Sequence, residues 1–362
     1  MAGYCLLAVS SVCAQADTTT LPQRTYQTTR VGDAVPVIDG HLDDACWEAV
    51  EWSGDYTQWE PFNLEEPSQS TAFKVLYDDR NLYLAFRCYD TEPHRIERRM
   101  SRRDGFAGDW VEVNIDSYHD LRTAFSFTLT AAGVKGDEFV SNDGGNWDTS
   151  WNPIWFAKTQ QDSLGWTAEY RIPLSQLRFA AGREQVWGIQ STRRLFREEE
   201  RATWQPIVLG QPGWVSRFGK LRGIHDLEPL RQRELQPYVL GQVQSAPVDE
   251  GNPFSKRNTT RFSAGLDGRL GITNDLTLDF TINPDFGQVE ADPGALNLDG
   301  FRIFFSERRP FFIENRNIFD YRLTGSEAGG QYDSDLLFYS RRIGGPPHRQ
   351  IGNDPDIDYY AE

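Results

Sequence analysis

Short stretches of alternating apolar and polar residues are the feature that most constrains the fold of this chain. Between residues 110 and 116, Glu112, Asn114 and Asp116 alternate with β-branched side chains, which is the period of a half-buried β-strand. The three polar residues therefore share one face of the strand. Roughly nine such strands precede residue 227 without a long helical period, so we predict an all-β, antiparallel β-sandwich.

The remaining strands follow the same pattern. A polar turn at residues 78–81 joins two apolar runs and predicts a hairpin. A brief helix is expected over residues 43–49, with Trp47 in the core, and Trp155 is expected to pack in the core as well. The strands are predicted at residues 35–38, 72–77, 82–89, 110–116, 123–130, 151–158, 166–172, 187–196 and 201–207.

Composition excludes several classes of function. The net charge is −16, from 53 acidic and 37 basic residues, which would repel a phosphate backbone, so nucleic acid is not expected as a partner. No apolar run is long enough for a membrane-spanning helix. Aromatic residues make up 13% of the chain, a bias that suits sheet packing or stacking on a flat ligand.

The first residues predict export. Residues 1–16 contain an apolar stretch and end in Ala14-Gln15-Ala16, a small-x-small pattern typical of a secretory signal peptide, and residues 17–30 are interpreted as a linker. Cleavage there leaves Cys46 and Cys88. In an oxidising compartment these two could form one disulfide, or they could be two separate buried thiols.

Beyond residue 226 the sequence pattern changes. Residues 235–239 predict a strand and residues 242–258 a polar loop, and alternating stretches at 262–270 and 276–282 flank a Thr-Asn-Asp turn. Two such strands suit the start of a transmembrane β-barrel, whereas the alternative is a soluble hairpin. Residues 227–362 are therefore interpreted as the N-terminal, truncated part of a barrel-like domain, in a chain expected to be a fragment of a longer protein.

The first domain resembles the family 9 carbohydrate-binding modules, a DOMON-like β-sandwich, over residues 31–226. The similarity lies in the order and spacing of Ile38-Asp39-Gly40 with Trp47, Asp78-Asp79 with Leu82-Tyr83, the GDWVEVNID stretch of residues 108–116, and Gly165-Trp166 with Glu169 and Ile172-Pro173. From about residue 235, the stretches NPDFGQVEAD (283–292) and ERRPFF (307–312) resemble the uncharacterised domain that follows such modules in bacterial envelope proteins. That second resemblance implies a Gram-negative outer-membrane β-barrel.

The first resemblance also implies a binding site. Sugar-binding members hold a sugar between two aromatic rings, whose places fall here on Phe106 and Trp214, and a carboxylate that accepts from sugar hydroxyls falls on Glu112. An aromatic face suits the flat C–H surface of a pyranose. This chain departs from the family pattern by having Phe106 in place of Trp, and Ser126 and Thr128 in place of Arg and Asn. A hydroxyl cannot replace the forked donors of a guanidinium.

No catalytic constellation is evident. Glu112 and Asp116 lie four residues apart on one strand, roughly 13 Å, which is too far for a pair of glycosidase carboxylates, and Asp116 is expected at a solvated strand edge. The five His residues are scattered, so no zinc site is predicted. Calcium suits the chain better than zinc, because the oxygen-rich loops at residues 104–109 or 137–143 can supply carboxylates and carbonyls, but neither loop has the regular spacing of a dedicated calcium loop.

The expected function is noncatalytic binding of an oligo- or polysaccharide by an exported envelope protein, in glycan capture, uptake or catabolism. One alternative is an outer-membrane transport or structural protein whose sandwich is a docking domain. A less favoured alternative is an accessory part of an O-glycosyl hydrolase. The sequence names neither the glycan nor the orientation of the sandwich relative to the membrane.

Overall fold

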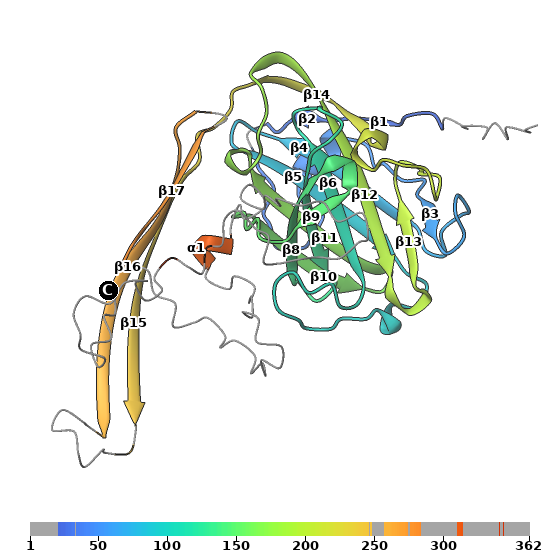
Figure 1. Cartoon of the computed structure of the whole chain (residues 1–362). Helices are drawn as coiled ribbons and strands as arrows, with labels where there is room; N and C mark the ends of the chain where they lie inside the picture. The colour runs from blue at the N-terminus through green and yellow to red at the C-terminus, as the bar shows by residue number, and fades with distance from the viewer. Residues whose placement is uncertain are drawn as a thin grey trace, which may run out of the picture.

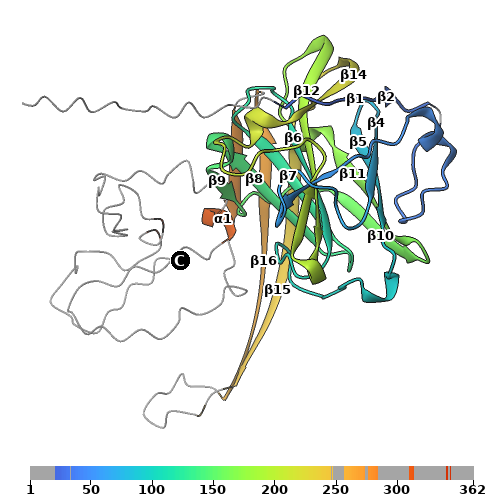
Figure 2. The same ribbon diagram turned by 90° about the vertical axis from the view of Figure 1, so that its right-hand side faces the viewer.

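A computed structural model describes residues 21–245 except 33, together with 247, 257–273, 276–283, 310–313, 340 and 343. Within these ranges two β-sheets pack face to face, and a third, smaller sheet extends away from them (Figures 1 and 2). The predicted all-β sandwich is confirmed. The expected signal peptide, residues 1–16, and the two sequence stretches at 283–292 and 307–312 lie largely outside the described residues.

The larger sheet has nine strands, with β12 at its centre. Its main path runs β1 (Thr25–Gln27), β14 (Gly219–Leu227), β12 (Gly182–Leu195), β6 (Trp110–Asp116), β7 (Ala124–Thr130), β8 (Lys135–Ser141) and β9 (Asn146–Asp148). Two further strands, β13 (Glu200–Thr203) and β3 (Thr57–Glu60), extend it from one end of β12.

The opposing sheet has five strands. Their order is β10 (Phe156–Asp162), β11 (Gly165–Pro173), β5 (Asn81–Tyr89), β4 (Thr71–Tyr77) and β2 (Thr29–Arg30). All neighbouring strands of the two sheets are antiparallel except β1 beside β14 and β2 beside β4. The chain therefore passes from one sheet to the other between Gln27 and Thr29, and residues 25–30, expected as linker, belong to the sandwich.

Two predicted strands were wrong in position. Residues 35–38 form no strand, which fits the presence of Pro36 because proline donates no ladder hydrogen bond. The strand expected at 151–158 begins at Phe156 and ends at Asp162.

The helices of the described ranges are single short turns, and none is long and apolar enough to cross a membrane. They are η1 (Ala45–Ala49), η2 (Pro93–Arg95), η3 (Asn142–Gly144), η4 (Leu174–Gln176), η5 (Phe196–Glu198), η6 (Val215–Arg217) and α1 (Pro310–Ile313).

The main core fills the space between the two sheets with aromatic and β-branched side chains. Trp155 lies there, as predicted, with its ring stacked on Tyr170 at 5.3 Å and edge-on to Phe127 at 5.4 Å. The other face of the five-stranded sheet is also covered, because Trp47 of η1 packs with Leu76. The prediction of Trp47 as a core residue is therefore confirmed.

Cys46 and Cys88 are both free thiols. Cys88 is fully buried in the core between the sheets, whereas Cys46 packs beside the cluster on the opposite face of the five-stranded sheet. Burial raises the pKa of the Cys88 thiol to about 12, so this thiol is protonated and unreactive in the folded protein. Of the two alternatives left open by the sequence, the structure has separate thiols.

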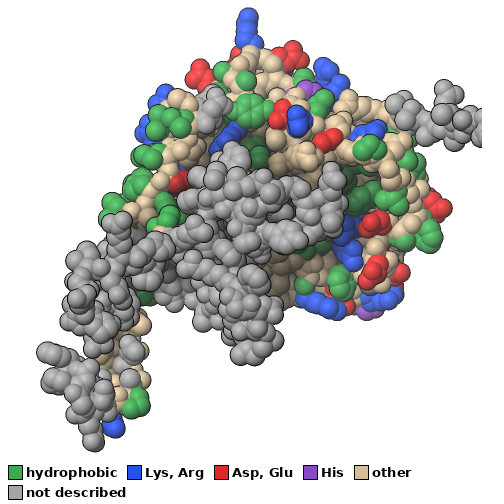
Figure 3. Space-filling model, in the orientation of Figure 1, with side chains coloured by type: hydrophobic (Ala, Val, Ile, Leu, Met, Phe, Trp, Pro, Cys, Tyr) green, Lys and Arg blue, Asp and Glu red, His purple; other side chains and the backbone are tan. Residues whose placement is uncertain are grey.

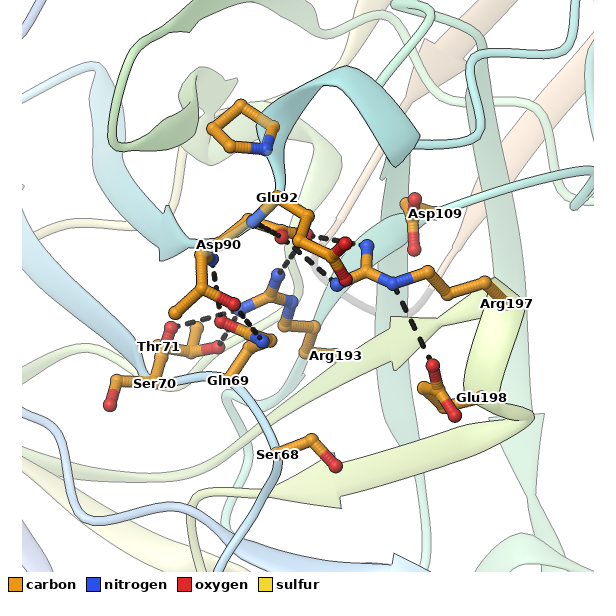
Figure 4. Close-up of polar contacts among 12 residues, drawn as sticks. Ser68, Gln69, Ser70, Thr71, Asp90, Glu92, Asp109, Arg193, Arg197 and Glu198 are labelled. Atoms are coloured by element: carbon orange, nitrogen blue, oxygen red, sulfur yellow. Dashed lines mark hydrogen bonds and ion pairs between the residues drawn. The ribbon is translucent and has the colours of Figure 1, made fainter.

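A buried ion-pair network fixes the end of β12 against the loop that follows β5 (Figure 4). Arg197 donates from both terminal nitrogens to the Asp90 carboxylate at 2.7 and 2.9 Å. Arg193 lies 4.0 Å from the same carboxylate and donates to the Ser70 carbonyl at 2.9 Å. Asp109 accepts the backbone amide of Phe196 at 2.8 Å. The network sets the position of the three residues between its arginines, which include Arg194 and Phe196.

The third sheet consists of β15 (Arg233–Ser245), β16 (Asn258–Gly271) and β17 (Thr277–Ile282), all antiparallel. The predicted hairpin is confirmed, although β15 and β16 are longer than expected and reduce the predicted 242–258 loop. Apolar side chains share one exposed face, with Val239 at 79% and Phe262 at 80% exposure. Hydrophobic side chains are visible along this sheet at the left of Figure 3. Gln176 donates to Glu234 at 2.7 Å and ties β15 to the sandwich.

Candidate functional site

A pocket opens on the polar face of the nine-stranded sheet, away from the main core. Its cavity volume is about 420 Å³, within the range of small-molecule sites. Six of its eleven lining residues are aromatic and four are charged. They are Trp59, Phe106, Trp110, Glu112, Glu138, Trp147, Thr192, Arg194, Phe196, Arg201 and Trp214.

Glu112 forms part of the pocket floor, on central strand β6. Its carboxylate accepts from Asn114 Nδ2 at 2.6 Å and from Thr128 Oγ1 at 3.1 Å, and the residue is 7% exposed. Burial raises the pKa of Glu112, and these two hydrogen bonds lower it in part. The period-two pattern explains these contacts, because Asn114 follows on the same face and Thr128 lies directly opposite on β7.

Glu138 adds a second carboxylate, two strands away on β8. Its backbone pairs with Ser126 of β7, so its side chain lies on the same face as Glu112. Burial raises the pKa of Glu138 to about 7, and repulsion from Glu112 and three further carboxylates adds to the shift. A half-buried acid with such a pKa in a cleft marks a functional-site candidate.

Trp214 forms one wall and is placed by the loop before η6. Its backbone amide donates to Asp143 Oδ1 at 3.1 Å, and its Cβ lies against Gly144, where a methyl group would come within 2.4 Å of it. The ring centroid lies 5.3 Å from that of Trp59 and 6.2 Å from that of Trp147. These three rings create a continuous aromatic wall.

Phe106 lines the pocket from the loop before β6. Its ring covers Gly136 of β8, where any Cβ would lie 2.4 Å from the ring, so the absence of a side chain at this position makes room for the phenyl group. The Phe106 and Trp110 ring centroids are 6.4 Å apart. Phe106 and Trp214 are each half-buried, which leaves part of each ring open to a ligand.

Donor groups lie toward the β12 and β13 side. Arg194 and Arg201 are directly opposite each other across these strands. Arg201 Nε lies 3.7 Å from Glu60 Oε2, and its guanidinium lies 5.9 Å from the Trp59 ring centroid. Among the described residues, no hydrogen-bond partner is found for the buried Nε1 of Trp214 or the buried Oγ1 of Thr192. Unpartnered polar atoms in a pocket indicate a place for a polar ligand.

The structure brings the three sequence-predicted site residues, Phe106, Glu112 and Trp214, together in this one pocket. Their role in binding stays a prediction. Sequence reasoning missed Trp59, Trp147, Glu138, Arg194 and Arg201 as lining residues. No local pattern singles out Glu138, because the β8 sequence KGDEFVS does not alternate. Trp59 and Arg201 meet only through the pairing of β3 with β13.

Asp116 was expected at a solvated strand edge, and this prediction is wrong. The residue is buried, with 1% exposure. It accepts the backbone amides of Asp120 at 3.1 Å and Leu121 at 2.9 Å, so it closes the turn after β6. Every residue of β6 is buried, on the core face and on the polar face alike.

The loops considered for calcium use their carboxylates internally. Asp104 accepts the backbone amide of Asp137, and Asp137 accepts from Arg103 and Trp155. Asp143 accepts from Ser216. Across the described parts of the chain, no group of three or more His, Cys, Asp or Glu side chains is placed to hold a metal ion. These residues therefore do not fit a calcium site.

Two protein families match the chain. Residues 38–193 match the carbohydrate family 9 binding domain-like model, and residues 228–358 match a domain of unknown function, DUF5916. No curated protein shows significant similarity to the chain.

Three solved structures show low similarity, each over 56% of this chain. Two are of a family 9 carbohydrate-binding module from Caldicellulosiruptor kristjanssonii. The complex with glucose has 18% identity, a TM-score of 0.42 and 98% of its chain covered. The complex with cellotriose has 20% identity, a TM-score of 0.40 and 96% of its chain covered. The third is a candidate carbohydrate-binding protein from Bacteroides uniformis, with 15% identity, a TM-score of 0.44 and 100% of its chain covered. By the family models, the sandwich is similar to the carbohydrate family 9 binding domain, and the segment that follows it is similar to a domain of unknown function.

Proposed function

We propose that the sandwich binds carbohydrate, without catalysis, in the pocket between Phe106 and Trp214. The observation that carries the proposal is the convergence of six aromatic rings with two carboxylates and two arginines in one cavity of about 420 Å³. Aromatic faces suit the C–H surface of a sugar ring, and the charged groups suit its hydroxyls, which both donate and accept. The match to the carbohydrate family 9 model supports the same function.

Calorimetric titration of the whole chain with glucose and cellotriose tests this function. Trp214→Ala removes the ring at the centre of the aromatic wall, and we expect sugar affinity to fall about 5- to 150-fold, since one lost stacking face is worth about 1–3 kcal/mol. Trp52→Ala is the matched control, because Trp52 is an exposed tryptophan (43%) that does not line the pocket. The sugar affinity of the Trp52→Ala variant should equal that of the wild type.

A folded protein that gives no binding heat with any mono- or oligosaccharide would contradict the proposal. The sandwich would then act as a docking domain. Equal loss of affinity in Trp52→Ala and Trp214→Ala would place the site elsewhere. Release of reducing ends during the titration would show that the protein hydrolyses glycosides, which the proposal excludes.

We also propose that the protein is exported to the outer membrane of a Gram-negative cell, where it captures or takes up glycans for catabolism. The N-terminal small-x-small pattern supports export, and the two-faced third sheet supports membrane insertion. On β15, Val239 and Val243 lie on the apolar exposed face, whereas Gln242 alternates with them.

Membrane fractionation of the full-length protein from a Gram-negative host provides the test. Wild type should be recovered with outer-membrane proteins. A lysine facing lipid costs about 2–4 kcal/mol at the bilayer centre, so Val239→Lys should reduce that recovery, and Gln242→Lys, on the polar face of the same strand, should not. Recovery of the wild type in the soluble periplasmic fraction would rule out this localisation.

A further inference from the structure

The acidic end of the pocket has no positive partner. After burial, the four largest interactions that shift the pKa of Glu138 all raise it, and all come from carboxylates: Glu112, Asp104, Asp137 and Asp148. No hydrogen bond or ion pair from another described residue to the Glu138 carboxylate is found. A half-buried carboxylate is ordinarily paired, and leaving it unpaired costs free energy that a ligand can recover.

The arginines of the pocket do not supply that partner. Arg194 and Arg201 lie on β12 and β13. Three strand spacings, roughly 14 Å in all, separate β12 from β8, which carries Glu138. Arg201 has Glu60 beside it at 3.7 Å, and the Arg194 guanidinium lies 5.7 Å from the centroid of the Phe196 ring. The pocket is therefore polarised, with donors at one end and an unneutralised acid at the other.

Two neutral polar groups in the pocket restrict the chemical class of the ligand further. Trp214 Nε1 is a donor without an acceptor, and the hydroxyl of Thr192, which is 2% exposed, has no partner among the described residues. A simple alkylammonium ion would neutralise the acid but offer nothing to these groups. A sugar ring that carries an ammonium group would neutralise the acid and also offer hydroxyls to Trp214 Nε1 and Thr192. The aromatic walls favour cations as well as sugar faces.

From this arrangement we propose that the pocket selects amino sugars, with Glu138 as the specificity-determining residue that receives the protonated amine. The inference rests on the proposed sugar-binding function and names its substrate class. Binding of an ammonium group stabilises the charged form of Glu138, so the proton that the acid holds near and below pH 7 leaves when the ligand binds.

Calorimetry of the whole chain with glucosamine, N-acetylglucosamine and glucose tests the inference. At pH 7 we expect glucosamine to bind about tenfold more tightly than the two neutral sugars, the effect of one pKa unit of interaction. At pH 6, titration in buffers of different ionisation enthalpy should show release of about 0.4 proton per glucosamine, the change when a pKa of about 7 falls by one unit, and none for N-acetylglucosamine.

Glu138→Gln keeps the shape of the side chain and removes its charge. In this variant the preference for glucosamine and the proton release should both disappear, while binding of glucose is retained. Glu184→Gln is the matched control, because Glu184 is an exposed glutamate of β12 outside the pocket. It should behave as the wild type.

The outcomes separate this inference from the proposed function. Binding of glucose and glucosamine with equal affinity and without proton release would overturn the amino-sugar preference and leave sugar binding intact. Retention of the preference in Glu138→Gln would overturn the role of Glu138. Absence of binding by all three sugars, with cellotriose also unbound, would overturn both.

Discussion

Asp90→Ala should lower the free energy of unfolding by about 3–5 kcal/mol, the cost of leaving a buried charge without its partner. The Asp90 side chain is completely buried, and those of Arg193 and Arg197 are 2% and 8% exposed. Removal of the carboxylate leaves both guanidinium groups close together without the acid that neutralises them (Figure 4). Guanidinium chloride denaturation at pH 7, followed by tryptophan fluorescence, measures the change.

Asp79→Ala is the matched control for that experiment. Asp79 pairs with Arg30 at the surface, where its side chain is 80% exposed, and exposed pairs contribute about 0–1 kcal/mol. A loss in Asp90→Ala no larger than in this control would contradict the structural role of the network.

The Asp90 prediction also has a pH dependence. Burial alone would raise the pKa of Asp90, but hydrogen bonds from Arg197 and from the Glu92 amide outweigh it and hold the pKa below its usual value. The stabilisation is present above the unfolded pKa of about 3.9 and is lost as the pH falls through the lower folded value. The difference between wild type and Asp90→Ala should therefore shrink below about pH 4.

Trp155→Ala should cost about 3–5 kcal/mol of unfolding free energy, the range for removing a large aromatic side chain from a core. The loss combines the cavity beside Phe127 and Tyr170 with the hydrogen bond from Trp155 Nε1 to Asp137 at 2.8 Å. Trp155→Phe separates the two, because it retains most of the packing but not the donor. Thermal and chemical denaturation give the two differences.

Trp52→Ala is again the control, since this exposed ring contacts Lys74 at the surface. Its unfolding free energy should change by less than about 1 kcal/mol. If Trp155→Ala destabilised the protein no more than Trp52→Ala, Trp155 would not be an essential part of the core.

The strands that sequence predicts best are those whose pattern depends only on their own residues. Residues 110–116 form β6 with the predicted bounds, because alternation reports directly which side chains face the core. Two predicted features were wrong because they depend on distant segments. Residues 25–30 form strands through pairing with Lys220 and Leu76, and Asp116 is buried because β12 pairs beside it at Gly188.

The site shows the same division. Glu112 could be singled out on β6 from local pattern and family resemblance, and Phe106 and Trp214 from resemblance. Glu138 could not be chosen over other acids, since its unusual environment arises when β8 aligns beside β7 and β6. The contact of Trp59 with Trp214 joins residues far apart in the chain, and no single-sequence pattern reports such a pairing.

The position of β1 beside β14 determines when the sandwich can be completed during folding. The first strand of the larger sheet pairs only with its last, at Lys220 to Arg222, so residues 25–27 find their partner only when nearly the whole domain is available. Pairing over such sequence separation slows folding and leaves strand edges open in the meantime. A chain cut before residue 219 would therefore lack β14 and present an aggregation-prone edge of β12.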